Sequence, residues 1–191
     1  VKATGCDTFI IHARKAWLQG LSPKENREIP PLDYQRVYRL KAAHPELTVV
    51  INGGIEDLAL AADHLRHVDG VMLGRAAYQT PWLLHDVDHQ LFGDRATPVT
   101  RAEVLRRLMP HVARHIESGG RLGNVTRHIL GLYHGEAGGK IFRRIMIEAG
   151  PQPGAGPEVL QGAIERTEQA RTDAAQRALE RRRLPAAEAE A

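Results

Sequence analysis

Two short apolar runs that end in glycine offer the clearest opportunity for chemistry in this sequence. Thr48-Val-Val-Ile-Asn-Gly-Gly-Ile55 is followed, after a helical segment, by Asp69-Gly-Val-Met-Leu-Gly-Arg-Ala76. Glycine lets the backbone approach a ligand closely, and the N–H groups that follow such a turn can donate to an anion. The turns Asn52–Gly54 and Gly74–Arg75 therefore predict a phosphate cradle of the kind built by the last two strand-to-helix turns of an α/β barrel. Two ordinary buried strands that end in turn glycines fit the same pattern.

This cradle requires strands and helices that alternate along the first half of the chain. Apolar periodicity predicts the strands Asp7–His12, Leu47–Ile51 and Val71–Leu73, and helices over residues 34–43 (with Asp33 as the cap), 56–66, 75–78 and 81–92. A long polar loop, residues 18–31, follows the first strand. The order predicts an α/β fold that is the C-terminal part of a (β/α)8 TIM barrel. A whole barrel needs about 250 residues, and this chain has 191.

The second half of the chain shows only helical patterns. After a linker-like break at residues 93–98, the expected helices are Arg101–Glu117 with Thr100 as the cap, Val125–Tyr133, Lys140–Ala149 and one from about Pro157 to Leu179. We therefore expect three parts: a partial barrel at residues 1–93, a small all-α domain at 100–179, and a charged flexible tail at 180–191.

The charge distribution points to a polyanionic partner. The net charge is only +3, but residues 101–149 hold nine Lys or Arg against four Glu. A basic excess in one region is typical of a polyanion binder, although a solvated helical face has the same composition. A single cysteine favours the reducing cytoplasm, and no apolar run approaches the roughly 20 residues that span a membrane. The spacing of His, Cys and acidic residues shows no metal site.

Two longer strings carry a family resemblance. They are His12-Ala-Arg-Lys-Ala-Trp-Leu-Gln-Gly-Leu-Ser-Pro-Lys-Glu-Asn-Arg-Glu-Ile-Pro-Pro31 and Thr126-Arg-His-Ile-Leu-Gly-Leu-Tyr-His-Gly135. Together with the two glycine turns, they make residues 1 to about 150 resemble the C-terminal part of a tRNA-dihydrouridine synthase. The resemblance is to the A subfamily, which acts on uridines 20 and 20a of the tRNA D loop.

The resemblance implies an FMN-dependent reduction of uridine to 5,6-dihydrouridine. In that family electrons pass from NADPH to FMN, hydride goes from the flavin to C6 of uracil, and a cysteine on a loop protonates C5. Matching the motifs residue by residue gives the expected flavin and phosphate contacts: His12, Asn52, Gly53, Gly54, Gly74 and Arg75. The residues expected to meet tRNA phosphates are Lys24, Arg27, Lys140 and Arg143. The expected full-length enzyme is a monomer.

The sequence also departs from the family pattern. The first barrel strands and the loop with the catalytic cysteine are missing, and Cys6 precedes a strand rather than lying on such a loop. Because the chain opens on Val1, we expect it to begin mid-domain and to be inactive alone. Two alternatives remain open: an RNA-binding helical module without catalysis, and a flavin oxidoreductase barrel that acts on a small molecule. Trp17 is compatible with stacking on RNA and with packing against the barrel.

Overall fold

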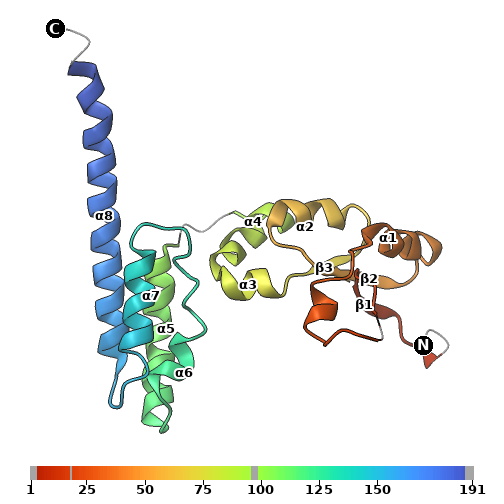
Figure 1. Ribbon diagram of the computed structural model, residues 1–191, viewed down its shortest axis with the longest axis horizontal. Helices are drawn as coiled ribbons and strands as arrows, with labels where there is room; N and C mark the ends of the chain where they lie inside the picture. Colours follow the sequence, from red (N-terminus) through yellow and green to blue (C-terminus); the bar gives the residue numbers. More distant parts are fainter. Residues whose placement is uncertain (1–3, 18, 96–98, 188–191) are drawn as a thin grey trace. The chain divides into compact units, whose positions relative to one another are not determined.

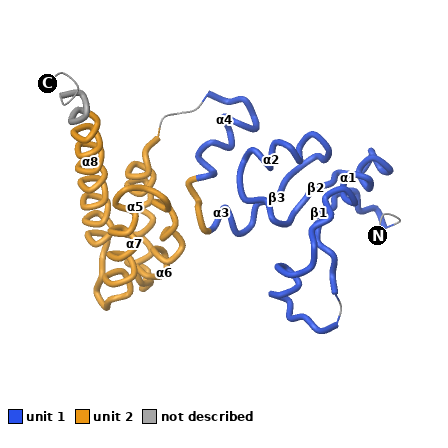
Figure 2. The backbone as a smooth tube through the Cα atoms, turned by 45° about the horizontal axis from the view of Figure 1, so that its top comes forward, with its two compact units in different colours: residues 1–78, 83–95 blue, residues 79–82, 96–191 orange. Residues whose placement is uncertain are grey.

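The computed structural model describes residues 4–17, 19–95 and 99–187, which form two compact units (Figure 2). Unit 1 comprises Val1–Tyr78 and Leu83–Arg95, and unit 2 comprises Gln79–Trp82 and Ala96–Ala191. The division falls near the break expected after residue 93, except that residues 79–82 belong to the second unit.

Unit 1 is built on a parallel sheet of three strands in the order β1-β2-β3 (Figure 1). The strands are β1, Thr8–His12, β2, Thr48–Asn52, and β3, Gly70–Met72. Helix α1, Tyr34–Ala43, connects the first two strands, and α2, Leu58–Leu65, connects the second pair. This confirms the predicted α/β class and parallel strand–helix–strand order. The three strands form an open sheet, so the closed barrel stays a prediction.

Local capping fixes where the two connecting helices begin. The Asp33 side chain accepts a hydrogen bond from the backbone N–H of Arg36, as predicted for the start of α1. The Asp57 side chain accepts one from Leu60, so α2 begins at Leu58 and not at Glu56, where the apolar pattern places its start. A carboxylate at this position satisfies an N–H group that has no partner inside the helix.

The helices cover one face of the sheet. Val49 and Ile51 of β2 are fully buried, and Val37 of α1 and Ala61 of α2 belong to the same apolar core. Side chains on a strand alternate between faces, and on the opposite face Ile10 is 65% exposed. The sheet of unit 1 is therefore buried on one face and accessible on the other.

The end of unit 1 differs in detail from the expectation. Helix α3 runs over Arg75–Gln79, close to the predicted span. The single helix expected over residues 81–92 is instead a 3-10 segment, η3, Pro81–Asp86, followed by the α-helix α4, Val87–Phe92. Asp86 is the N-cap residue of α4, so the chain changes its helical type there.

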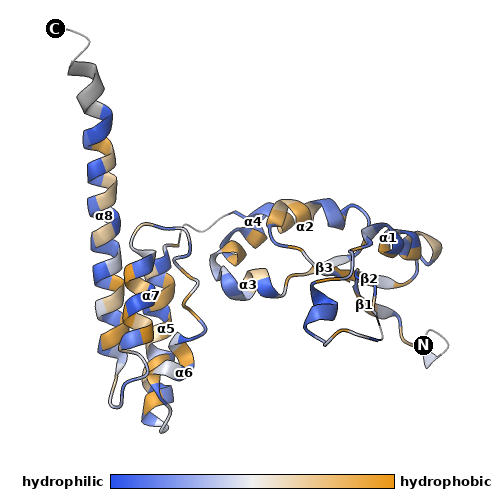
Figure 3. Cartoon of the chain, in the orientation of Figure 1, coloured by the Kyte–Doolittle hydropathy of each residue, from blue (hydrophilic) through white to orange (hydrophobic). Residues whose placement is uncertain are grey.

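Unit 2 is a helical bundle of α5, Arg101–Glu117, α6, Leu122–Thr126, α7, Gly139–Glu148, and α8, Pro157–Ala187. Thr100 and Glu103 form the capping box at the start of α5, as predicted. Figure 3 shows apolar positions along α5, α7 and the first part of α8, where these helices meet. The buried side chains at their centre include Leu105, Phe142, Met146, Leu160 and Ile164.

The predicted helix Val125–Tyr133 is wrong. Helix α6 ends at Thr126, and residues 127–138 form consecutive turns, with i to i−3 hydrogen bonds such as Leu132 N–H to Ile129 O at 3.0 Å. A Cβ on Gly131 would lie 1.9 Å from the carbonyl oxygen of Gln79, so the two backbones lie too close together for any side chain at this position. Tertiary packing in unit 2 overrides the local helical pattern here.

Helix α8 is longer than predicted. It continues to Ala187, so residues 180–187, expected to belong to a flexible tail, are helical, and residues 188–191 lie outside the described part of the chain. The break expected at residues 93–98 also lies partly outside it, since residues 96–98 are not described. Among the described residues, no helix has the length and apolar character that crossing a membrane requires.

Candidate functional site

His12 and the first glycine turn lie together at the carboxyl edge of the sheet. His12 pairs with Asn52 in the β1–β2 ladder, and the backbone N–H of Ala13 donates to the carbonyl of Asn52 at 2.7 Å. Gly53 has a φ of +117°, and a Cβ there would lie 2.7 Å from His12 Nδ1. Only glycine accommodates both the backbone conformation and the imidazole ring. The fold thus places the His12 ring against the turn that the sequence assigns to the same site.

Tyr34 supports this turn through a hydrogen bond. Its hydroxyl donates to the carbonyl oxygen of Gly53 at 2.9 Å. Gly54 has a φ of +68°, and a Cβ there would lie 2.6 Å from Leu32 Cδ1 and 3.1 Å from the Tyr34 hydroxyl. By its spacing alone, Tyr34 is an apolar position of the helix, so sequence reasoning misses this role. Side chains on a helix lean toward its N-terminus, so the position of Tyr34 directly after the Asp33 cap is a signal that could have indicated this role.

A buried histidine fixes Tyr34 in turn. The His64 ring packs edge-on against Tyr34 with centroids 4.4 Å apart, and its Nδ1 shares a hydrogen bond with the Tyr38 hydroxyl at 2.6 Å. Burial lowers the pKa of His64, an effect that Asp63 opposes and His67 reinforces. The buried His64 ring therefore packs against Tyr34, whose hydroxyl holds the glycine turn.

The second turn leaves the sheet at the same edge. Met72 pairs with Asn52 in the β2–β3 ladder, so the segments after β2 and β3 begin at one level of the sheet. Gly74 has open space around it, since a Cβ added there would find its nearest neighbour, Met72 Sδ, at 3.9 Å. The Arg75 side chain is exposed, and its Nη1 lies 3.2 Å from Glu28 Oε1.

Arg14 ties the long loop to the strand end, a role that sequence reasoning misses. Its Nη1 donates to the carbonyl oxygens of Glu28 (3.0 Å) and Pro30. The same Glu28 pairs with Arg75 through its carboxylate. The loop is therefore held at both the end of β1 and the start of α3.

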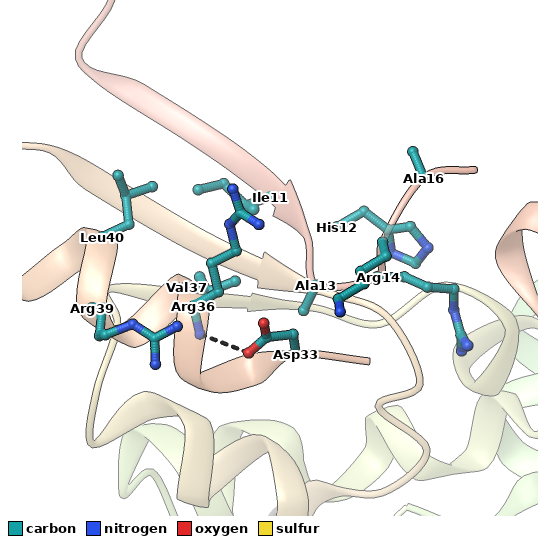
Figure 4. Close-up of a pocket in the computed structure, with 11 residues that line it drawn as sticks. Ile11, His12, Ala13, Arg14, Ala16, Asp33, Arg36, Val37, Arg39 and Leu40 are labelled. Carbon is teal, nitrogen blue, oxygen red and sulfur yellow. Dashed lines mark hydrogen bonds between the residues drawn. The ribbon is translucent and has the colours of Figure 1, made fainter. Parts of the chain in front are cut away.

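A pocket of about 630 Å³ lies between the end of β1 and α1 (Figure 4). Four cationic side chains line it: Arg14, Lys15, Arg36 and Arg39. Asp33, also in the lining, is engaged by the backbone of α1 (Figure 4). Of the six predicted cofactor residues, His12 lines this pocket and the other five do not.

The predicted tRNA-binding residues are all exposed. Lys24 and Arg27 lie at the ends of a 3-10 turn, η2, Glu25–Arg27, inside the long loop of unit 1. Lys140 and Arg143 lie three residues apart on α7 in unit 2, so they share one side of that helix.

The basic excess of unit 2 remains on its surface. Arg101 does not add to this surface excess, because its guanidinium pairs with Glu136 at 2.9 Å and lies over the Trp82 ring. The exposed basic residues between positions 101 and 149 are Arg106, Arg107, Arg114, Arg121, Arg127, Lys140, Arg143 and Arg144. The exposed acids there are Glu103, Glu117 and Glu148. An outward-facing excess of this kind suits a polyanionic ligand.

Neither a metal site nor a reactive cysteine emerges from the described residues. No group of three or more His, Cys, Asp or Glu side chains gathers there to hold a metal ion. Cys6 precedes β1, and its Sγ donates a weak hydrogen bond to the carbonyl of Thr8 at 3.4 Å. We assign it no catalytic role.

Comparison with known proteins agrees with the family resemblance seen in the sequence. The family described as dihydrouridine synthase matches residues 1–169. The tRNA-dihydrouridine(20/20a) synthase of Shewanella oneidensis is 52% identical over 165 residues, which is 86% of this chain and 49% of the relative. Those of Vibrio cholerae and Salmonella typhi are 51% and 53% identical over 84% and 83% of this chain. The chain spans about half the length of these curated relatives, and residues 170–191 lie beyond the family match.

Proposed function

Because the chain belongs to the dihydrouridine synthase family, we propose that it forms part of an FMN-dependent enzyme that reduces uridine to 5,6-dihydrouridine in tRNA. The names of the relatives favour positions 20 and 20a as the target. The observation that carries the proposal is the His12 ring against the positive-φ Gly53 turn, in a chain about 52% identical to those relatives. The lone cysteine and the tRNA substrate favour a cytoplasmic protein, and we propose a monomer.

The residues at the sheet edge fit the phosphate end of FMN. A phosphate monoester carries nearly two negative charges at neutral pH. Gly53 and Gly54 carry no side chains of their own, His12, Leu32 and Tyr34 pack beside them, and no backbone acceptor among the described residues takes up their N–H groups. Arg75 adds a planar fork of donors, which suits a phosphate better than a single ammonium does. We assign Asn52, Gly53, Gly54, Gly74 and Arg75 to the phosphate and His12 to the flavin.

A bound FMN, once reduced by NADPH, would supply the hydride for the double bond of the uracil ring, and a general acid would supply the proton that completes the reduction. The residues of this chain would bind and orient the cofactor. The glycine turn would fix its phosphate end, and Tyr34 holds that turn through a hydrogen bond to the Gly53 carbonyl. We place no catalytic acid in this chain.

Lys24 and Arg27 in unit 1, and Lys140 and Arg143 in unit 2, are proposed to contact tRNA phosphates. Contacts of this kind position the RNA without reading its sequence. The exposed basic excess of unit 2 supports the assignment.

The test uses a full-length protein that contains this chain. We expect the purified protein to show the absorbance of bound flavin and to form dihydrouridine in unmodified tRNA when NADPH is supplied. A colourless protein that still binds tRNA would contradict the enzymatic proposal and favour an RNA-binding module. A flavoprotein that neither binds nor modifies tRNA would favour a small-molecule reductase.

A second prediction concerns the salt dependence of tRNA binding. The double substitution Lys24→Glu/Lys140→Glu removes two proposed phosphate contacts, so the slope of log affinity against log salt should fall by about two. Binding would be measured by titration between low and moderate salt. The matched control reverses one exposed arginine in each unit, Arg66→Glu/Arg181→Glu, and should leave the slope near that of the parent protein. Equal slopes for parent and Lys24→Glu/Lys140→Glu would refute the assignment of these lysines.

A further inference from the structure

Trp17 is an exposed aromatic residue whose backbone is hydrogen-bonded to a neighbouring side chain. The residue is 47% exposed. The backbone N–H of Trp17 donates to Asn26 Oδ1 at 2.9 Å, and Asn26 Nδ2 donates back to the Trp17 carbonyl at 2.9 Å. One side-chain amide therefore satisfies both backbone groups of the residue. The ring is exposed to solvent next to a backbone whose N–H and carbonyl both have partners.

The anchor Asn26 is itself held by local structure. Its N–H donates to the carbonyl of Ser22 at 2.9 Å, and it lies within η2. Ser22 and Glu25 exchange hydrogen bonds in the manner of a capping box: Ser22 N–H donates to Glu25 Oε2 at 2.8 Å, and Glu25 N–H to Ser22 Oγ at 3.3 Å. Hydrogen bonds from the side chain and the backbone N–H of Ser22 to the Glu25 carboxylate lower the pKa of Glu25. Asn26 is thus placed by hydrogen bonds within its own loop.

The surroundings of Trp17 are cationic. Lys15, Lys24 and Arg27 are exposed in the same segment. Against these three cations the segment holds two carboxylates, Glu25, which accepts a hydrogen bond from Ser22, and Glu28, which pairs with Arg75. An exposed aromatic ring among exposed basic side chains is the combination with which proteins hold unpaired nucleotides: the ring stacks on a base and the cations meet the flanking phosphates.

We propose that Trp17 is a stacking platform for an unpaired base of the tRNA substrate, with Lys24 and Arg27 on the adjacent phosphates. This inference rests on the proposed function, since it assumes that tRNA is the substrate. To the proposed function it adds a contact that distinguishes an unpaired loop nucleotide from a base-paired one. A base inside a duplex has no free face that could stack on a protein ring.

The test compares Trp17→Leu with Trp17→Phe in a full-length protein that contains this chain. The leucine variant keeps an apolar side chain but loses the aromatic face, so affinity for unmodified tRNA should fall about tenfold. The phenylalanine variant should recover most of that loss. Stacking releases no counterions, so the salt slope of Trp17→Leu should equal that of the parent, whereas Lys24→Ala should lower the slope by about one.

Two RNA probes sharpen the comparison: a hairpin with an unpaired loop, and a blunt duplex of the same length. The leucine substitution should weaken binding of the hairpin and leave binding of the duplex unchanged. Flavin content, measured by absorbance, should be the same in all variants and serves as the control for folding. Equal hairpin affinity for parent and Trp17→Leu would overturn the stacking role, and so would a loss that phenylalanine does not restore. Failure of the parent itself to bind tRNA would instead overturn the proposed function.

Discussion

Gly53→Ala is expected to abolish retention of FMN and to lower the free energy of unfolding by about 2 kcal/mol or more. A non-glycine residue in a left-handed backbone conformation costs about 1–2 kcal/mol, and Gly53 has a φ of +117°. The new Cβ would also lie 2.7 Å from His12 Nδ1, so the imidazole must move. The Gly53 turn, proposed to hold the FMN phosphate, and the His12 ring, proposed to contact the flavin, would both be displaced.

A matched control separates these two effects. Gly20 has a φ of +84°, but nothing lies within 4 Å of a Cβ placed on it. Gly20→Ala should therefore carry only the conformational penalty and keep its flavin. The measurements are flavin absorbance per protein and the midpoint of denaturant unfolding, both in a full-length protein that contains this chain. If Gly53→Ala retained the flavin content of Gly20→Ala, the turn after β2 would not be the phosphate site.

Arg75→Ala is expected to weaken FMN binding about 10- to 100-fold, which corresponds to the 1.5–3 kcal/mol of a hydrogen bond to a charged group. Arg75 is exposed and contacts the exposed Glu28 carboxylate at 3.2 Å, and a surface ion pair of this kind contributes little to stability. The substitution should therefore leave the free energy of unfolding nearly unchanged. The measurement is a titration of the protein, stripped of its cofactor, with FMN.

Three further variants define what Arg75 contributes. Arg75→Lys keeps the charge but not the planar fork, and should fall between the parent and Arg75→Ala. Glu28→Gln releases Arg75 from its ion pair and should bind FMN at least as tightly as the parent. Arg66→Ala removes an arginine that pairs with Asp63 on α2 and should have no effect. Unchanged affinity in Arg75→Ala would remove the second turn from the site.

Elements specified by neighbouring residues could be predicted from the sequence. The Asp33 cap of α1 and the Thr100–Glu103 capping box of α5 each depend on groups within three residues of one another. The three strands follow from short β-prone apolar runs. The family followed from the strings His12–Pro31 and Thr126–Gly135 together with the two glycine turns.

Elements that depend on distant residues could not be predicted. The apolar spacing in residues 125–133 favours a helix, but Gly131 packs against the carbonyl of Gln79, in a distant segment of the chain. The role of Arg14 has no local signal, because the carbonyls it binds, at Glu28 and Pro30, are reached only after the long loop folds back. The asparagine that anchors Trp17 has no local signal for the same reason.

The sequence by itself determined the α/β order, the caps at Asp33 and Thr100 and the glycine positions of the candidate site, because those features depend on residues close in the chain. Only the tertiary structure decided that His12 lies against Gly53 and that Tyr34 holds the Gly53 carbonyl. These contacts join three segments through the register of β1 on β2, in which His12 faces Asn52. Register follows from burying the apolar positions of paired strands on one face of the sheet, and these strands are far apart in the chain.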